Sequence, residues 1–380
     1  MTSTKEETNR NSKMSKPKTR NNLIIVGDFP PPITGAAKNN RIVAEQFGGE
    51  FNVIRFDTSG RFLSLNRNLV FHLIRVGKFF STLLRLCLMF VTKRCILYHV
   101  PNAGFGLFYS VAFVFAAFVF SVPVVLHHRT FRYIDAKSRI MALMSSIGRR
   151  RVHHVFLSPG MEKAFREFYP FPDERASVVS NAALIDIPTG KARCLGSQLV
   201  IGHLSNLCKE KGLYDVMATF RLLIENGIDA RLSLGGPAVS NEVADDISKF
   251  VDEFPCLVDV KGPIGIESKE AFYQDVDVFL FPTQYRVEAQ PNVVFEALTS
   301  GCLVVAYARG SIPEMMPADA GLVVSVDKDF GEVTQSWIAE VIRIPDQLGK
   351  LSASSLCFIE QEQQKGKREF FNLIAKMKEL

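Results

Sequence analysis

Two glutamates eight positions apart, Glu288 and Glu296, are the residues of this chain with the clearest chemical use. A carboxylate can accept two charge-assisted hydrogen bonds from a vicinal diol. The apolar run at 277–282 predicts a buried strand before Glu288, and Pro291 suits the first position of a helix that carries Glu296. Glu288 is therefore expected on a loop that leaves a strand, at the edge where open α/β sheets bind ligands.

Strands and helices alternate along both halves of the chain. Strands are expected at 22–29, 51–56, 95–100, 123–126, 199–204, 230–234, 257–260, 277–282 and 303–307. Helical patterns occupy about 37–48, 67–92, 105–120, 213–226, 239–253, 268–274 and most of 332–380. This alternation predicts an α/β protein with two Rossmann-like, doubly wound sheets that face each other across a cleft.

The length of 380 residues is enough for two domains, each with its own core. We expect a disordered basic tail at 1–21, a first domain at 22–188 and a second at 189–380, whose terminal helix packs back toward the first. The seven cysteines form no C-x-x-C pair and residues 1–21 lack an apolar core, so no disulfide framework, zinc site or signal peptide is indicated. A cytoplasmic location is the simplest interpretation.

Charge divides the chain unevenly. Residues 1–186 hold 26 Lys and Arg against 12 Asp and Glu, a balance of +14, whereas residues 187–380 hold 19 against 27, a balance of −8. Within 58–151 there are 14 basic residues and one acid, Asp135. Because basic and apolar residues interleave in the helical stretch 67–92, we expect peripheral binding to an anionic membrane surface; the alternative is a solvated basic face.

The segment 105–126 has no charged residue over 22 positions, which is long enough to cross a bilayer. The alternative is a buried helix followed by a buried strand. Pro123 and the β-branched residues beside it favour a break and a strand, which leaves the helical part too short to span.

Four segments together resemble family 4 retaining glycosyltransferases of the GT-B fold, which build bacterial polysaccharides and glycolipids. They are Gly27 to Gly35, Leu204 to Gly212, Glu288 to Glu296, and Gly310 to Glu314. The resemblance runs from about 22 to 330. It implies a nucleotide-sugar donor in the cleft, held mainly by the second domain, and an acceptor on the first domain. The implied acceptor is a lipid-linked or glycan precursor at the inner face of the membrane.

The resemblance also implies roles for single residues. Glu296 would hold the ribose hydroxyls, and Glu288 would contact the donor sugar. Lys211 supplies a cation before the helix at 213, and Gly35 lets the first domain approach the donor closely. Gly236, in the turn after the strand at 230–234, belongs with the residues expected to bind the nucleotide.

Three positions depart from the family pattern. Asn206 stands where many members have an arginine, so the diphosphate clamp is expected to be weaker or to shift to Lys209. Pro291 replaces a glycine and offers no N–H, which moves the expected phosphate donors to Asn292 and Val293. Ser311 replaces a second glycine in the last segment.

His127 and His128 follow the strand that ends at Leu126, so they are expected at the cleft. A histidine there can donate to a sugar hydroxyl or assist proton movement. We favour His128, with a structural histidine as the alternative. Asn181 matches an asparagine that often ends the first domain, and its role could be structural alone.

No metal and no cofactor are expected beyond the donor itself, and nucleic acid is not an expected partner. Asp275 and Asp277 imitate a D-x-D metal motif, but no cluster of further ligands surrounds them. Two other functions stay open: a GT-B nucleotide-sugar epimerase, which would act on donor without acceptor, and an inactive scaffold of a polysaccharide complex, which would not hydrolyse the donor. A dehydrogenase is disfavoured because no G-x-G-x-x-G follows either first strand.

Overall fold

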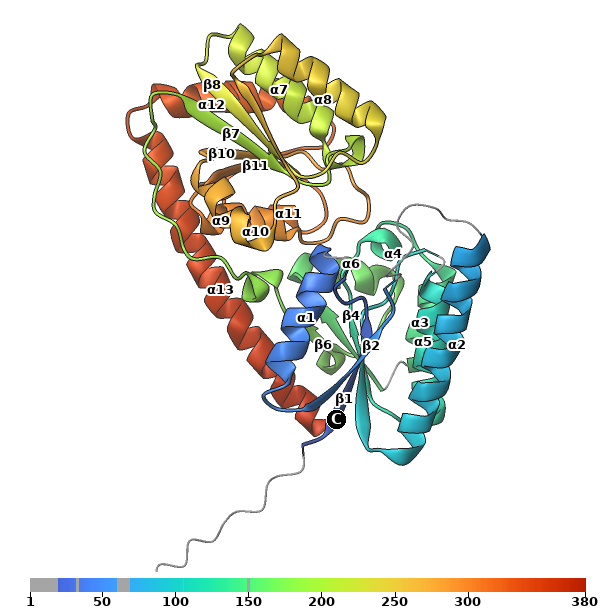
Figure 1. The fold of residues 1–380 in the computed structure, drawn as a ribbon. Helices are drawn as coiled ribbons and strands as arrows, with labels where there is room; N and C mark the ends of the chain where they lie inside the picture. Colours follow the sequence, from blue (N-terminus) through green and yellow to red (C-terminus); the bar gives the residue numbers. More distant parts are fainter. Residues whose placement is uncertain (1–19, 32–33, 60–68, 105, 149–150) are drawn as a thin grey trace, which may run out of the picture.

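The computed structural model describes residues 20–31, 34–59, 69–104, 106–148 and 151–380. Most of the tail expected at 1–21 therefore lies outside the described residues. Two six-stranded parallel sheets form the two domains (Figure 1), as the alternation of strands and helices predicts. Among the described residues, no helix has both the length and the apolar character needed to cross a membrane.

The first sheet has the strand order β2-β1-β3-β4-β5-β6. The strands span Asn22–Gly27 (β1), Asn52–Asp57 (β2), Cys95–His99 (β3), Val124–His127 (β4), Val152–Phe156 (β5) and Ala176–Val178 (β6). Its helices are α1 (Gly35–Phe47), α2 (Leu69–Thr92), α3 (Gly106–Val119), α4 (Arg132–Asp135), α5 (Arg139–Gly148) and α6 (Pro159–Phe168). The stretch 105–126 is thus the helix α3 followed by the strand β4, and Phe105 itself lies outside the described residues.

Each face of the first sheet has its own core. Leu23 and Ile25 of β1 point toward α1, whereas Ile24 and Val26 point toward the side that carries α2, α3 and α5. This alternation follows from the two-residue period of a strand that is buried on both faces. It leaves the cleft edge of the sheet to the residues that follow each strand.

The second sheet has the order β12-β11-β10-β7-β8-β9. The strands span Leu199–Leu204 (β7), Ala230–Gly235 (β8), Val258–Gly262 (β9), Val278–Phe281 (β10), Leu303–Tyr307 (β11) and Gly321–Val324 (β12). The helices are α7 (Leu213–Glu225), α8 (Asn241–Glu253), α9 (Ile266–Gln274), α10 (Asn292–Thr299), α11 (Ile312–Met315), α12 (Phe330–Arg343) and α13 (Gln347–Glu379).

The terminal helix α13 runs along both domains (Figure 1). Near its start the Ser352 hydroxyl donates to the Gly301 carbonyl of the second domain at 2.6 Å. Near its end Phe370 and Leu373 join the core that contains Leu23 of the first domain. One continuous helix therefore belongs to the cores of both domains and fixes their separation on that side.

Candidate active site

The loops that follow β7 and β10 meet at the carboxyl edge of the second sheet. Lys211, after β7, forms an ion pair with Glu288, after β10. The Lys211 ammonium also lies 4.8 Å from the centre of the Tyr285 ring, and Thr283 Oγ1 lies 3.5 Å from Glu288 Oε2. The structure thus brings together the two residues expected to contact the diphosphate and the sugar, with opposite charges in contact.

Two glycines allow these loops to pack so closely. Gly212 has a φ of +84°, and a Cβ there would lie 2.2 Å from the Pro282 carbonyl oxygen. Gly236 has a φ of +115°, and its Cβ would lie 1.7 Å from the Ser205 carbonyl oxygen. Only glycine adopts such backbone geometry without strain. Gly236 therefore has a steric reason for its identity, in addition to the nucleotide contact expected of it.

Asn206 and Lys209 lie on the same loop after β7, and both side chains are exposed. The loop is tied to the one after β10, because the Gln284 N–H donates to the Glu210 carbonyl at 2.9 Å. Within the described part of this loop, Lys211 is the side chain that forms an ion pair with Glu288.

Glu296 is fully buried inside α10. Its Oε2 accepts from Lys269 at 2.6 Å and from the Tyr273 hydroxyl at 3.1 Å, while its Oε1 lies 3.5 Å from Lys38 of the first domain. Burial, with the neighbouring carboxylate as the next cause, raises the pKa of Tyr273 well above its ordinary value, so the phenol stays a donor. Both carboxylate oxygens of Glu296 therefore have neighbours in the described chain, Lys38 at Oε1 and Lys269 with Tyr273 at Oε2.

Asn292 and Val293 form the first turn of α10, and Pro291 is the extended residue before the helix, one position earlier than the first helical position predicted for it. The Asn292 amide exchanges two hydrogen bonds with Asn39 of α1, at 2.7 and 3.3 Å. The first backbone N–H groups of a helix have no acceptor within the helix, so this turn can still receive an anion. The Asn292 side chain, however, is already hydrogen-bonded to Asn39 of the first domain.

Gly35 is the first residue of α1, and Thr34 caps that helix by accepting from the Ala37 N–H at 3.1 Å. Gly35 is exposed, and among the described residues no heavy atom lies within 4 Å of the position that a Cβ would take. The approach of Gly35 to the donor stays a prediction.

The two adjacent histidines have different surroundings. His128 is fully buried away from the cleft: its Nδ1 bonds to the Tyr133 hydroxyl and its Nε2 to His154 Nδ1, both at 2.9 Å. Its ring also stacks on Phe156, 4.9 Å between centres. The structure therefore does not support the preference for His128, because strand alternation turns its side chain into the core of the first domain.

His127 points to the opposite face, toward α1. Its Nδ1 bonds to the Tyr98 hydroxyl and lies 3.3 Å from an Arg129 nitrogen, while its buried Nε2 has no hydrogen-bond partner among the described residues. Burial, followed by the charge of Arg129, holds the pKa of His127 well below its ordinary value. A neutral ring can donate one hydrogen bond and accept another, but it does not serve as a cation here.

Sequence reasoning missed how strongly the stretch between the two glutamates binds the first domain. Gln290 Oε1 accepts from the Asn181 N–H at 2.6 Å, and its Nε2 donates to the Leu157 carbonyl at 3.1 Å. From the next loop, Glu314 accepts from the Ser158 hydroxyl at 2.6 Å and from the Gly160 N–H at 3.0 Å. Gln290 lies inside the eight-residue spacing, and that position was the one available signal.

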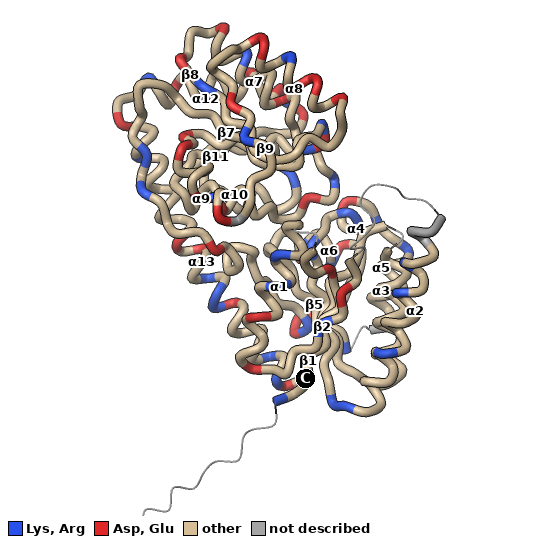
Figure 2. Tube along the Cα trace, in the orientation of Figure 1, with Lys and Arg blue, Asp and Glu red and all other residues tan. Residues whose placement is uncertain are grey.

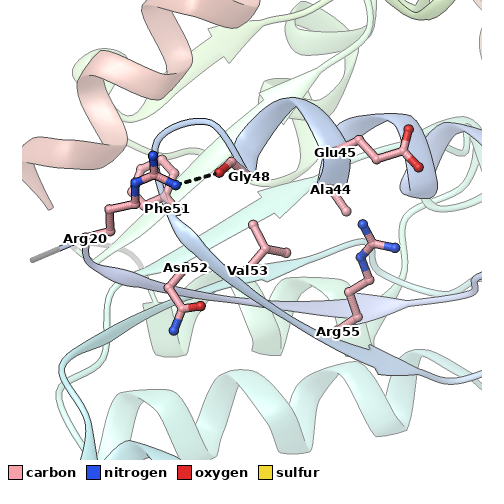
Figure 3. Close-up of a pocket in the computed structure, with 8 residues that line it drawn as sticks. All are labelled: Arg20, Ala44, Glu45, Gly48, Phe51, Asn52, Val53 and Arg55. Carbon is pink, nitrogen blue, oxygen red and sulfur yellow. Dashed lines mark hydrogen bonds between the residues drawn. The ribbon is translucent and has the colours of Figure 1, made fainter.

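Asn181 packs at the join between the domains, where its amide also donates to the Gln290 carbonyl at 2.9 Å. Among the described residues there is no group of three or more His, Cys, Asp or Glu that could hold a metal ion. Asp277 instead accepts from the Val200 N–H at 2.9 Å. A separate hollow lined by Arg20, Phe51, Asn52 and Arg55 lies at the opposite end of α1 (Figure 3), away from these residues.

The second domain matches a known sequence family. The family described as Glycosyl transferases group 1 matches residues 198–340, which run from β7 into α12. The Staphylococcus aureus protein CapM, a capsular polysaccharide biosynthesis glycosyltransferase, is 25% identical over 134 residues. That alignment covers 35% of this chain and 34% of CapM.

Solved structures resemble the whole chain. Anabaena HepE in complex with UDP-glucose has a TM-score of 0.67 and 14% identity, and the match covers 93% of this chain and 99% of HepE. Sucrose-phosphate synthase from Thermosynechococcus elongatus has a TM-score of 0.70 and 13% identity, with 94% and 99% covered. This chain has the GT-B fold. The resemblance to GT-B glycosyltransferases is thereby confirmed, while membership of family 4 stays a prediction.

Proposed function

We propose that this protein is a retaining glycosyltransferase, which moves a sugar from a nucleoside-diphosphate sugar to an acceptor hydroxyl. The observation that carries the proposal is the contact of Lys211 with Glu288 directly before α10, within the segment that matches group 1 glycosyl transferases. A cation, a carboxylate and a helix amino terminus meet there, and these are the groups that a diphosphate and a sugar need.

In the proposed reaction, the bond between the anomeric carbon and the diphosphate oxygen breaks. The acceptor oxygen bonds to the same face of that carbon, and its proton passes to the leaving diphosphate oxygen. Lys211 and the first turn of α10 stabilise the charge that develops on the diphosphate. Glu288 orients the sugar, and Glu296 binds the ribose once Lys38 has moved from it.

The test begins with nucleotide binding. UDP-glucose is the first probe, because HepE is similar in fold and was solved with it; GDP- and ADP-sugars complete the panel. We expect thermal stabilisation by one base, and we expect Glu288→Ala to lose turnover by about a thousandfold while nucleotide binding stays within a few-fold. Full activity in Glu288→Ala would show that Glu288 has no part in the mechanism. If the protein bound none of the UDP-, GDP- and ADP-sugars, the proposal of a nucleoside-diphosphate sugar donor would be wrong.

We also propose that the first domain binds an anionic bilayer through α2 and α3 and takes its lipid-linked or polysaccharide acceptor there, at the cytoplasmic face. One stripe of α2 is apolar and between 41% and 69% exposed. Its members are Leu73, Val76, Phe80, Leu84, Leu88 and Val91, spaced by three or four residues. On α3, Phe115, Phe118 and Val119 are exposed as well. Contiguous apolar exposure of this extent is unusual on a free surface.

The charge on this face favours an anionic surface over a neutral apolar partner. The helix α2 contains Arg75, Lys78 and Arg85 and no acid, and Figure 2 shows blue but no red segments along it. Basic residues beside an apolar stripe are typical of helices that lie in a membrane interface. The same side of the molecule has the exposed Arg94 and Arg139.

Vesicle flotation tests this surface. We expect the protein to float with vesicles containing phosphatidylglycerol at low salt and to stay largely free with pure phosphatidylcholine. Leu84→Glu with Leu88→Glu should reduce flotation at least tenfold, whereas Val239→Glu, an exposed apolar residue of the second domain, should not. Equal flotation with both vesicle types, or no effect of the paired change, would contradict a membrane face on α2.

A further inference from the structure

Arg129, two residues after β4, is a half-buried cation of the first domain that lies beside contacts between the two domains. One terminal nitrogen of its guanidinium donates to Asn40 Oδ1 at 3.0 Å, and the other lies 3.3 Å from His127 Nδ1. Its Nε is buried and has no hydrogen-bond partner among the described residues. Within those residues, no acidic side chain forms an ion pair with it, and burial lowers the pKa of its guanidinium, with the Tyr98 hydroxyl partly opposing that shift.

The neighbouring histidine presents a second donor of the same kind. Tyr98 and Arg129 both lie within hydrogen-bond distance of His127 Nδ1, and an arginine can only donate. Neutral His127 therefore carries its proton on Nε2, which is buried and also without a partner in the described chain. Arg129 Nε and His127 Nε2 are thus two buried N–H donors on side chains in contact, each without an acceptor among the described residues, and such donors suit an anionic oxygen.

The position of Arg129 relates it to the proposed donor. The next residue, Thr130, donates to the Val287 carbonyl at 3.4 Å, one residue before Glu288. Asn40, which accepts from Arg129, adjoins Asn39, which pairs with Asn292. The guanidinium is thus bracketed by two contacts to the stretch between Glu288 and the first turn of α10.

The second domain leaves a need for such a cation. Asn206, at the position where an arginine would complete a clamp, is neutral, and Lys211 is already paired with Glu288. A diphosphate gains negative charge as its bond to the sugar breaks, and a single paired lysine balances little of it. Burying an arginine without an anion costs stability, which an incoming anion would offset.

We propose that Arg129 is the first-domain half of the diphosphate clamp and binds the β-phosphate of the nucleoside-diphosphate donor, opposite Lys211. His127 Nε2 donates to the same phosphate or to the adjoining sugar oxygen. The clamp closes only when the domains meet, so it ties bond cleavage to the closed arrangement. This inference rests on the proposed function.

The β-phosphate contact is tested by comparing nucleoside diphosphate with monophosphate. Calorimetric titration with UDP and UMP, or with the guanine or adenine pair if one of those stabilises the protein, gives the preference for the second phosphate. We expect Arg129→Gln to reduce that preference by ten- to a hundredfold, and Arg129→Lys to reduce it less. Arg132→Gln is the matched control, because Arg132 is an exposed arginine three residues away and the same charge is removed.

The thermal midpoint without nucleotide separates binding from a structural role. If Arg129 awaits an anion, Arg129→Gln has a midpoint equal to or above that of the unchanged protein and gains less from UDP. If its role is structural, both Arg129 variants have lower midpoints and keep the full preference for diphosphate, which would overturn the inference. Should Arg129→Gln not fold, Arg129→Lys decides by the same preference. If the unchanged protein binds no nucleoside diphosphate, the proposed function itself fails instead.

Discussion

The two domains have the same sheet design and opposite surfaces. The second domain is acidic overall and contains the whole match to group 1 glycosyl transferases. The first domain is basic, and its large exposed apolar side chains gather on α2 and α3, whereas those of the second are scattered. The second domain is therefore distinguished by a sequence pattern, whereas the first is distinguished by its surface chemistry.

The largest difference between the domains is expected in how an alanine substitution changes stability at two glycines of the predicted donor site, Gly236 and Gly35. Gly236→Ala in the second domain would place a Cβ 1.7 Å from a carbonyl oxygen at a φ of +115°. We expect it to lower the free energy of unfolding by more than about 4 kcal/mol, or to prevent folding. In Gly35→Ala of the first domain, the new Cβ would have no heavy atom of the described residues within 4 Å. We expect this change to alter the free energy of unfolding by less than about 1 kcal/mol.

Urea unfolding measures both variants. A folded Gly236→Ala protein with normal stability and weakened nucleotide binding would contradict the steric role and leave Gly236 as a binding residue alone. A strongly destabilised Gly35→Ala would show that the start of α1 is more confined than the surrounding space indicates.

The second largest difference is expected in acid, which should destabilise the first domain more than the second. In the first domain, burial lowers the pKa of His99 and His153 to about 4 and of His154 to about 3, and it also lowers those of His127 and His128. In the second domain, burial lowers the pKa of His203 to about 4. Each pKa unit corresponds to about 1.4 kcal/mol. These histidines are neutral when folded, so their contribution is present above about pH 6.5 and is lost as pH falls toward 4.

The single tryptophan, Trp337 in α12, makes the difference measurable. Its fluorescence reports on the second domain, whereas far-ultraviolet circular dichroism reports on both. At pH 7 we expect the two urea transitions to lie close together, and at pH 5 we expect the dichroism change to begin first. Transitions that coincide at both pH values would mean that the domains unfold as one unit and that the histidines of the first domain do not act separately.

The sequence predicted the elements whose patterns are local. The strands at β1, β3, β7 and β11 and the helices α2 and α7 lie within two residues of their expected bounds. The strands β5, β6 and β12 were missed. His153 and His154 interrupt the apolar pattern of β5. His154 packs on Phe156 and Phe171, and His153 bonds to the Ser177 hydroxyl, and no apolar periodicity reveals these partners.

The site was predicted in the same uneven way. Glu288 and Lys211 meet as residues at the ends of neighbouring parallel strands should. The choice between His127 and His128 depended on which side of β4 each occupies, and one residue of register reverses that choice. Lys38, Asn39 and Gln290 were missed because their partners lie in the other domain, more than a hundred residues away.

A substitution of Gln290, which lies at the join between the domains, should have an intermediate effect on the free energy of unfolding. Its buried amide accepts from the Asn181 N–H and the Ser180 hydroxyl and donates to Leu157. Gln290→Ala leaves those groups without partners and should lower the free energy of unfolding by about 2–3 kcal/mol. Gln284→Ala, at an exposed glutamine with one bond of 3.2 Å to Asp215, should cost less than about 0.5 kcal/mol. Equal small effects would mean that the join adds little stability.

The smallest expected effect is at the amide pair of Asn39 and Asn292, which connects the basic domain to the acidic one. Each single change to alanine removes both hydrogen bonds, of 2.7 and 3.3 Å, and should cost about 1 kcal/mol. The double change then loses the same bonds once, so urea unfolding should give a coupling energy of about 1 kcal/mol between the two positions. If the losses in free energy of unfolding of the two single variants add up to that of the double variant, the pair does not hold the domains together. The join between the domains would then depend on Gln290 and Glu314 instead.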